Sequence, residues 1–226
     1  MKKNLSIIVP FYNESKSIVK VIDEINQLDI DNHLIVINDG SDDLNENLKN
    51  IIREKADVYL ENKKNFGKGY SLTKAFNYCK DGYIVIKDAD LEYDTKDIKK
   101  LYNHASKNNL EVVYGSRFLK KKYMFNKSIF FYGNKFFTYI FNFLYKQKIT
   151  DAHTCYKFFN SNLLKNLNIH SKRFEFCAEF NSKIAKKNIV INEIPISYNQ
   201  RSKKEGKKIG IKDALVTLYI YLKHTL

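Results

Sequence analysis

Short apolar runs alternate with amphipathic segments through the first half of this 226-residue chain. Residues 5–9 form one continuous apolar run, and residues 15–28 place isoleucine and valine at the spacing of one helical face. Strands that are separated by helices typically join as βαβ units, so this pattern predicts an α/β fold with a mostly parallel central sheet flanked by helices. We expect strands at residues 5–9, 34–37, 58–60, 83–86 and 110–114, and helices at residues 15–28, 44–52, 70–78 and 95–105.

The second half of the chain concentrates aromatic residues. Residues 123–145 contain eleven of the 32 phenylalanine and tyrosine residues, with lysines at 120–122, 146 and 148 on either side. Such a segment is either a core helix or an interfacial helix that places aromatic side chains in a bilayer, and the flanking lysines favour the second interpretation. No boundary divides the halves cleanly, so we predict one domain over residues 1–226. Beyond the aromatic segment we expect a helix at 175–187, a strand at 189–198, a basic loop at 200–210 and an amphipathic helix at 211–222.

The chain is strongly basic, with 39 lysine and arginine residues against 25 aspartate and glutamate residues and a net charge of +14. This balance favours an anionic partner, either a phosphorylated substrate, a lipid surface or a nucleic acid. The three cysteines are far apart in sequence, which predicts unpaired thiols in a reducing compartment. No apolar run is long enough to span a bilayer or to form a signal-peptide core, so we expect a cytoplasmic protein that can rest on a membrane.

Polar loops follow four successive predicted strands. Asp88 and Asp90 come directly after residues 83–86, and the segments 10–14, 38–43 and 65–69 follow the three earlier strands. Parallel strands end at one edge of a sheet, where α/β proteins bind ligands, so these groups should meet there. Two carboxylates one residue apart suit Mg²⁺ or Mn²⁺ shared with substrate phosphates. Alone, the aspartate pair would more often be a solvated turn; the four loops together favour a binding site.

Taken together, these segments resemble the inverting glycosyltransferases of family 2, which have the GT-A fold. Within that family the chain is most similar to the polyprenyl-phosphate (dolichyl-phosphate) hexose synthases. The resemblance implies a nucleotide-diphospho-sugar transferase, with residues 1–118 as the nucleotide-sugar-binding half and residues 119–226 as the acceptor-facing and membrane-facing half. The family motifs match at residues 7–14, 38–41, 65–69, 88–90 and 115–118, and the closer similarity rests on residues 151–157, 174–176 and 193–209.

The resemblance also implies roles for individual residues. Asp88 and Asp90 would approach the ribose and bind the divalent metal on the diphosphate. One departure is Asn38, which stands where an aspartate is usual and removes one charge from the region of the base. The other implied contacts are Pro10, Tyr12, Glu14 and Asp39 with the base and ribose, Arg117 and Arg201 with phosphate groups, and Lys68 and Lys203 as positive charge beside the diphosphate.

Sugar transfer from a nucleotide diphosphate explains why these residue types are needed. Negative charge develops on the leaving diphosphate, and a divalent cation with nearby lysine or arginine stabilises it. A polyprenyl-phosphate acceptor is already anionic, so Arg117 would only need to orient it. A sugar hydroxyl would need a general base, for which Asp151 and His153 are candidates, although His153 could instead be a packing residue and Arg117 a strand cap. The expected catalytic residues are Asp88, Asp90, Arg117 and Asp151.

The leading expectation is therefore a metal-dependent, inverting enzyme that moves a hexose from a GDP-mannose-type or UDP-glucose-type donor to polyprenyl phosphate. It would act as a peripheral protein at the inner face of the cell membrane. The alternative is a family 2 enzyme that adds a sugar to a hydroxyl of a cell-surface glycan. Nucleic-acid binding is not expected, because the sequence has no RNA-recognition signature and its carboxylates gather at the predicted ligand edge.

Overall fold

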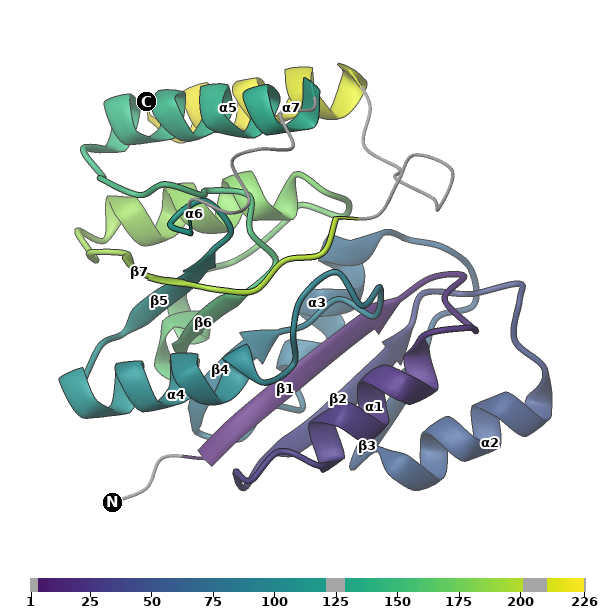
Figure 1. The fold of residues 1–226 in the computed structure, drawn as a ribbon. Coiled ribbons are helices and arrows are strands. Elements are labelled where there is room, and N and C mark those ends of the chain that lie inside the picture. Colours follow the sequence, from purple (N-terminus) through teal and green to yellow (C-terminus); the bar gives the residue numbers. More distant parts are fainter. Residues whose placement is uncertain (1–3, 121–128, 201–210, 226) are drawn as a thin grey trace.

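A seven-stranded sheet forms the centre of the molecule in a computed structural model that describes residues 4–120, 129–200 and 211–225. The strand order is β3-β2-β1-β4-β6-β5-β7 (Figure 1). All neighbouring pairs are parallel except those of β6, which runs antiparallel to both β4 and β5. The predicted α/β class is thus confirmed. The strands are β1 (Asn4–Phe11), β2 (His33–Asn38), β3 (Val58–Glu61), β4 (Gly82–Ile86), β5 (Val112–Ser116), β6 (Lys157–Asn160) and β7 (Asn192–Pro195).

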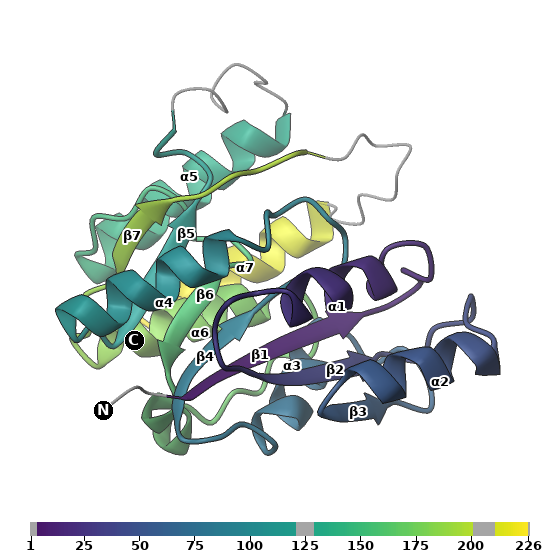
Figure 2. The ribbon, with the colours of Figure 1, turned by 60° about the horizontal axis from the view of Figure 1, so that its bottom comes forward.

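Helices cover both faces of this sheet. On one face, α1 (Ile18–Asn26) and α2 (Glu46–Lys55) pack side by side (Figure 2). Helix α4 (Asp97–Asn108) lies on the same face, and its Lys99 forms an ion pair with Asp29 in the loop after α1. On the opposite face, α3 (Lys68–Phe76) approaches α6 (Phe176–Lys186) through the rings of Phe76 and Phe176, whose centroids are 6.2 Å apart. The central strands are buried on both faces, which explains their continuous apolar runs.

Two aromatic helices form a further layer beyond α6. Helix α5 (Ile129–Tyr145) and helix α7 (Ile211–Lys223) lie next to each other above α6 in Figure 1. Tyr221 of α7 is fully buried, and its ring centroid is 5.5 Å from that of Phe141 of α5. Its backbone carbonyl accepts a hydrogen bond of 2.7 Å from the Tyr145 hydroxyl. The second half of the chain therefore adds an aromatic helical layer to the α/β core.

Three details differ from the sequence prediction. Strand β6 was not predicted, because its four residues are aromatic and polar instead of β-branched. Strand β7 is shorter than the predicted 189–198. Strand β1 continues beyond the predicted 5–9, through Pro10 to Phe11. The Ile8 carbonyl accepts a hydrogen bond from the backbone N–H of Lys87, on the side of β4. The backbone nitrogen of Pro10, two residues later, faces the same side but lies beyond the last residue pair between β1 and β4, so no N–H is needed there.

Candidate active site

The loops that carry the predicted site residues meet at one edge of the sheet. Strands β1 to β5 and β7 run in one direction, so their carboxyl ends share this edge. Strand β6 runs in the opposite direction, so the segment that leads into β6 starts at this edge too. The loops after β1, β2, β3 and β4 were expected to converge in this way, and they do. The loops after β5 and β7 and residues 151–156 before β6 lie at the same edge, and they include Arg117 and Asp151, which the family resemblance had assigned to the site.

The loops after β1 and β2 are tied together by reciprocal hydrogen bonds. The backbone N–H of Asn13 donates to Ser41 Oγ at 3.0 Å, and the Asn13 side chain accepts from the N–H of Asp42 at 3.0 Å. The Tyr12 hydroxyl reaches the Asp42 carboxylate at 3.5 Å. Glu14 accepts from the Ser17 hydroxyl at 2.8 Å at the start of α1. Tyr12 and Glu14 thus stand in an ordered loop pair beside the edge.

Asp39 is buried and fixes the loop that precedes α3. Its carboxylate accepts from the backbone N–H groups of Phe66 and Gly67 at 3.0 and 2.8 Å, and from the Asn62 amide at 2.9 Å. Gly67 has φ of +102°, and a Cβ there would lie 2.4 Å from the carbonyl oxygen of Lys172, so only glycine fits. The predicted contact of Asp39 with the base or ribose stays a prediction, and its visible role is to shape the Gly67–Lys68 turn.

Asn38 has a local reason to be an amide. It is buried, its Nδ2 donates to Glu61 Oε1 at 3.1 Å, and its Oδ1 accepts from the N–H of Ser41 at 2.9 Å. An aspartate at this position would face the Glu61 carboxylate across β2 and β3, which like-charge repulsion disfavours. The departure of this chain from the family pattern is therefore matched by a partner on the neighbouring strand.

Asp88 is paired with Lys68, the first residue of α3. The two charged groups form a short ion pair, with 19% of the Lys68 side chain and 25% of the Asp88 side chain exposed. The Lys68 ammonium is also 3.8 Å from the thiol sulfur of Cys155. Burial alone would raise the pKa of Asp88, but the adjacent Lys68 charge outweighs it and lowers that pKa. Asp88 is therefore an ionised carboxylate whose present counter-ion is a lysine.

Asp90 carries a carboxylate in a crowded acidic loop. Burial, with the charges of Asp88 and Glu92, raises its pKa to about 6, although it accepts a hydrogen bond of 3.1 Å from the N–H of Glu92. The buried Lys87 ammonium holds this loop by donating to the carbonyls of Asp88 and Tyr93, both at 3.0 Å. A divalent cation would relieve the repulsion that raises this pKa, so the two aspartates fit Mg²⁺ or Mn²⁺.

A protein-only metal cage is not found among residues 4–120, 129–200 and 211–225, where no three His, Cys, Asp or Glu side chains are grouped to hold an ion. Mg²⁺ commonly uses one or two carboxylates and completes its shell with water and substrate phosphates. The pair Asp88 and Asp90 has this character.

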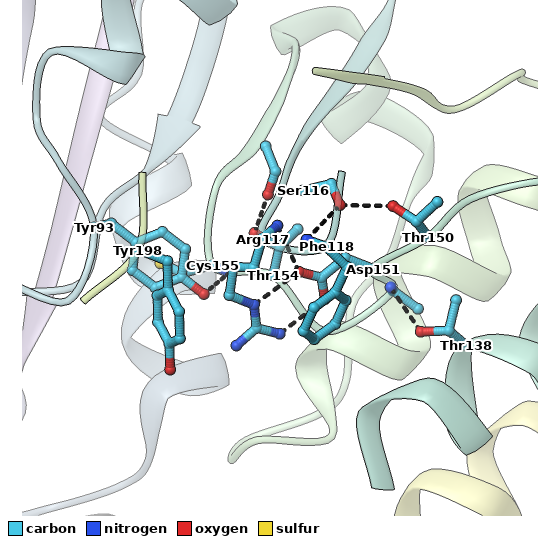
Figure 3. A network of polar contacts seen from close by, with 12 residues as sticks. Tyr93, Ser116, Arg117, Phe118, Thr138, Thr150, Asp151, Thr154, Cys155 and Tyr198 are labelled. Carbon is cyan, nitrogen blue, oxygen red and sulfur yellow. Dashed lines mark hydrogen bonds and ion pairs between the residues drawn. The ribbon is translucent and has the colours of Figure 1, made fainter. Parts of the chain in front are cut away.

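Arg117 and Asp151 form a second, deeper ion pair (Figure 3). Nε and Nη2 of Arg117 donate to the two carboxylate oxygens at 2.7 and 2.8 Å, and the Arg117 backbone N–H adds a bond of 3.1 Å. Burial alone would raise the pKa of Asp151, but the Arg117 guanidinium outweighs it and lowers that pKa. On its other side, the guanidinium carbon lies 5.3 Å from the centre of the Tyr198 ring. Sequence reasoning placed both residues at the site but did not pair them.

Glu193 supports this pair and was not singled out from the sequence. It accepts from the N–H and the hydroxyl of Thr150 at 2.6 and 2.9 Å, and from the N–H of Asp151 at 3.0 Å. Glu193 is 42 residues from Asp151, so no local spacing could have linked them; only the family match at residues 193–209 pointed to this segment. Tyr93 connects the two ion pairs, since its hydroxyl accepts from the N–H of Cys155 at 3.2 Å and its ring lies 5.4 Å from that of Tyr198.

His153 lies among aromatic side chains. Its ring is 5.9 Å from Phe137 of α5 and 6.2 Å from Tyr221 of α7, and its Nε2 is 3.3 Å from the Tyr221 hydroxyl. Burial lowers the pKa of His153 to about 3. These surroundings favour the packing interpretation over the general-base interpretation. Arg201 and Lys203, the remaining predicted site residues, lie outside the described residues.

The fold and this carboxylate-lined edge together define the GT-A class of glycosyltransferases. The model of glycosyl transferase family 2 matches residues 6–167, most of the chain, and the chain belongs to this family. Over 99% of its length the chain superimposes with a TM-score of 0.73 and 13% identity on 78% of glucosyl-3-phosphoglycerate synthase from Mycobacterium tuberculosis, solved with Mn²⁺, UDP and phosphoglyceric acid. S. aureus TarS, solved with UDP-GlcNAc, gives a TM-score of 0.62 at 14% identity over 98% of this chain and 66% of that one.

Relatives of similar sequence include transferases to dolichyl phosphate. The UDP-N-acetylglucosamine–dolichyl-phosphate N-acetylglucosaminyltransferase of Methanococcus voltae is 29% identical over 92% of both chains. The dolichyl-phosphate beta-glucosyltransferase of Dictyostelium discoideum is 27% identical over 87% of this chain and 66% of its own length. The low-salt glycan biosynthesis hexosyltransferase Agl6 of Haloferax volcanii is 27% identical over 87% of this chain, which spans only 48% of Agl6.

Proposed function

We propose that this protein is an inverting glycosyltransferase that moves a hexose from a nucleotide diphosphate sugar to polyprenyl phosphate. The observation that supports it most is the gathering of Asp39, Lys68, Asp88 and Asp90 on neighbouring loops at one sheet edge. The acceptor class is supported by the Methanococcus voltae relative, which matches over nearly the full length of both chains. In this proposal residues 1–118 bind the donor, residues 119–226 face the acceptor, and both belong to one domain.

The donor side would supply charge stabilisation. Asp88 and Asp90 would hold Mg²⁺ or Mn²⁺, which when bound offsets the charge that develops on the leaving diphosphate. Lys68 adds a cation beside them, and Pro10, Tyr12, Glu14 and Asp39 line the adjoining loops for the base and ribose. Arg201 and Lys203 belong to the same proposal as further phosphate contacts. Either a UDP or a GDP donor suits these residues.

The acceptor side would orient a phosphate. An acceptor oxygen attacks the anomeric carbon from the face opposite the diphosphate, and the electron pair of the broken carbon–oxygen bond leaves with the diphosphate. Since Asp151 occupies the Nε–Nη2 edge of Arg117, a phosphate would meet the other edge of the guanidinium, which Nη1 and the second N–H of Nη2 form. Asp151 then acts by holding Arg117 in place.

The same contacts disfavour a hydroxyl acceptor on a cell-surface glycan. Such an acceptor needs a general base whose pKa lies near the working pH. The Arg117 pair lowers the pKa of Asp151, and burial lowers the pKa of His153 to about 3. Both candidates are therefore weak bases, whereas a phosphate acceptor needs none.

Exposed aromatic side chains support peripheral contact with the inner face of the cell membrane. Tyr132, Phe136, Tyr139 and Phe143 repeat along one stripe of α5, and the last two are 68% and 76% exposed. The neighbouring α7 exposes further large apolar residues: Leu215, Val216, Tyr219 and Leu222. Apolar surface of this extent on a basic protein suits an interface with anionic lipid. None of the helices described is both long enough and apolar enough to cross a bilayer.

A transfer assay tests the proposed reaction. The protein is incubated with Mn²⁺, polyprenyl phosphate in detergent and radiolabelled UDP-glucose, UDP-N-acetylglucosamine or GDP-mannose, and the lipid is extracted into chloroform. We expect one donor to label the lipid through a glycosyl phosphate that mild acid cleaves. Label that appears only when a cell-surface glycan replaces the lipid, in an acid-resistant glycosidic product, would favour the glycan acceptor, and no labelled lipid with any donor would contradict the proposal.

A further inference from the structure

The ion pair between Lys68 and Asp88 stands where the proposed metal would bind. Asp88 is one of two carboxylates assigned to the cation, and its present charge partner is the Lys68 ammonium. Asp90, two residues away, accepts a hydrogen bond of 3.1 Å from the backbone N–H of Glu92 and forms no ion pair with any residue that the structure describes. One aspartate of the pair is therefore neutralised from within the protein, and the other is not.

The backbone beneath Lys68 is held rigidly. Asp39 binds the N–H of Gly67, and the N–H of Tyr70 donates to the carbonyl of Lys172 at 2.9 Å. A Cβ at Gly69 would lie 2.3 Å from the carbonyl oxygen of Ser171, so the first turn of α3 is in close contact with this segment. On the α3 side of the pair, the part that can move to free Asp88 is therefore the Lys68 side chain, which has four rotatable bonds and is 19% exposed.

We propose that Lys68 is a positioning residue that serves as the internal counter-ion of Asp88 and transfers to the donor diphosphate when metal and nucleotide bind together. A metal ion alone must displace a well-placed ammonium from Asp88. When a diphosphate arrives with the metal, it offers that ammonium a new anionic partner. Binding of either ligand then favours the other, which is a positive coupling free energy between two ligands at one edge. The inference rests on the metal and donor assignments of the proposed function, but not on its acceptor.

The test measures binding without turnover. Calorimetry at pH 8 gives the dissociation constant of Mn²⁺ with and without saturating UDP, and in parallel with GDP, for the parent and for Lys68→Met. We expect UDP or GDP to tighten Mn²⁺ binding at least about tenfold in the parent. In Lys68→Met, Mn²⁺ alone should bind about tenfold more tightly than to the parent, because two neighbouring carboxylates lose their competing cation, and the coupling should shrink correspondingly.

Control variants separate this role from a structural one. Lys99→Met removes a lysine from an ion pair with Asp29 at the opposite sheet edge and should leave both constants unchanged. Lys68→Arg keeps the charge and should keep the coupling, and Lys68→Gln replaces Lys68→Met if the latter unfolds. Unchanged or weaker binding of Mn²⁺ alone in the uncharged variant would overturn the proposal. If the parent labels lipid but the uncharged Lys68 variant keeps the full coupling, only this inference is contradicted. If the variant loses coupling but the parent labels no lipid, only the proposed acceptor is contradicted.

Discussion

The two ion pairs at the sheet edge differ in depth and in number of contacts. Arg117 and Asp151 are 10% and 0% exposed and share two side-chain bonds and one backbone bond. Lys68 and Asp88 are 19% and 25% exposed and share a single contact between a flexible ammonium and one carboxylate oxygen. The first pair has the geometry of a fixed structural element, and the second has the geometry of a pair that can exchange partners.

This difference in geometry suggests different functions for Arg117 and Lys68, although both are cations paired with an aspartate. A planar guanidinium bound on one edge by a carboxylate keeps its position, which suits the orientation of an acceptor. A lysine ammonium is a point charge on a flexible stem, which suits a site where a metal and a diphosphate enter and leave. The depth of each pair therefore predicts how strongly its loss affects stability compared with binding.

The largest expected effect on stability is that of Asp151→Asn. Loss of one partner of a buried pair leaves the Arg117 charge uncompensated, which costs about 3–5 kcal/mol of unfolding free energy. Urea denaturation at pH 7 measures the change. A loss below about 1 kcal/mol would show that the pair is not the fixed element that its geometry indicates.

Asp88→Asn should have a small effect on stability and a large effect on sugar transfer. Its pair is partly exposed and makes one contact, so the unfolding free energy should fall by about 1 kcal/mol or less. Sugar transfer should fall about 100-fold or more, the order of loss when a charge-stabilising group is removed. Parallel urea and transfer measurements decide this, and a variant that loses stability but keeps transfer would reverse the comparison.

The pH dependence of the unfolding free energy tests the electrostatic environment of Asp90. The folded protein raises the pKa of Asp90 to about 6 from its ordinary value of 3.8, so on acidification it binds a proton before the unfolded chain does. Without metal, the parent should therefore gain stability relative to Asp90→Asn as the pH falls from 7 to 4, and that gain should be complete below the lower value. Denaturation of both proteins across this range is the measurement. A parent that instead loses stability relative to the variant would show that Asp90 is stabilised in its charged form.

The smallest effect on folding should come from the exposed helix face. Phe143→Ser changes a side chain that is 76% exposed, so unfolding free energy should change by no more than about 0.5 kcal/mol. Flotation with vesicles that contain anionic lipid should fall severalfold if this stripe contacts the bilayer. Tyr78→Ser, on an exposed tyrosine just after α3, is the matched control and should float like the parent. Equal flotation of all three proteins would remove α5 from the membrane proposal.

Local sequence patterns predicted most of the fold, because each strand and the helix that follows it are formed by contiguous residues. The apolar runs of β1, β2 and β4 and the faces of α1 and α4 were placed within a few residues of their observed bounds. Strand β6 was missed because its position between β4 and β5 depends on a distant pairing, with Phe158 opposite both Val85 and Val113. Its first residue, Lys157, is buried only because Ala152 and Asn181 accept its ammonium protons at 3.0 Å.

The candidate site likewise has a part that the sequence predicted and a part that it did not. The edge position of Asp88, Asp90 and Asp39 followed from the loops after predicted strands. The partners of Arg117, Asp151 and Glu193 did not, since they depend on contacts between β5, the segment before β6 and β7. Pairing of charges across a sheet edge is a tertiary property, so the residues could be named from the sequence while their functions relative to one another could not.

Metal dependence of sugar transfer is the direct test of a cation bound by Asp88 and Asp90. The parent and Asp90→Ala are assayed in excess chelator and again after Mn²⁺ is restored. We expect chelator to stop transfer by the parent, Mn²⁺ to restore it, and Asp90→Ala to remain inactive under both conditions. Undiminished transfer by the parent in chelator, or full activity of the variant, would contradict a cation held by these two carboxylates.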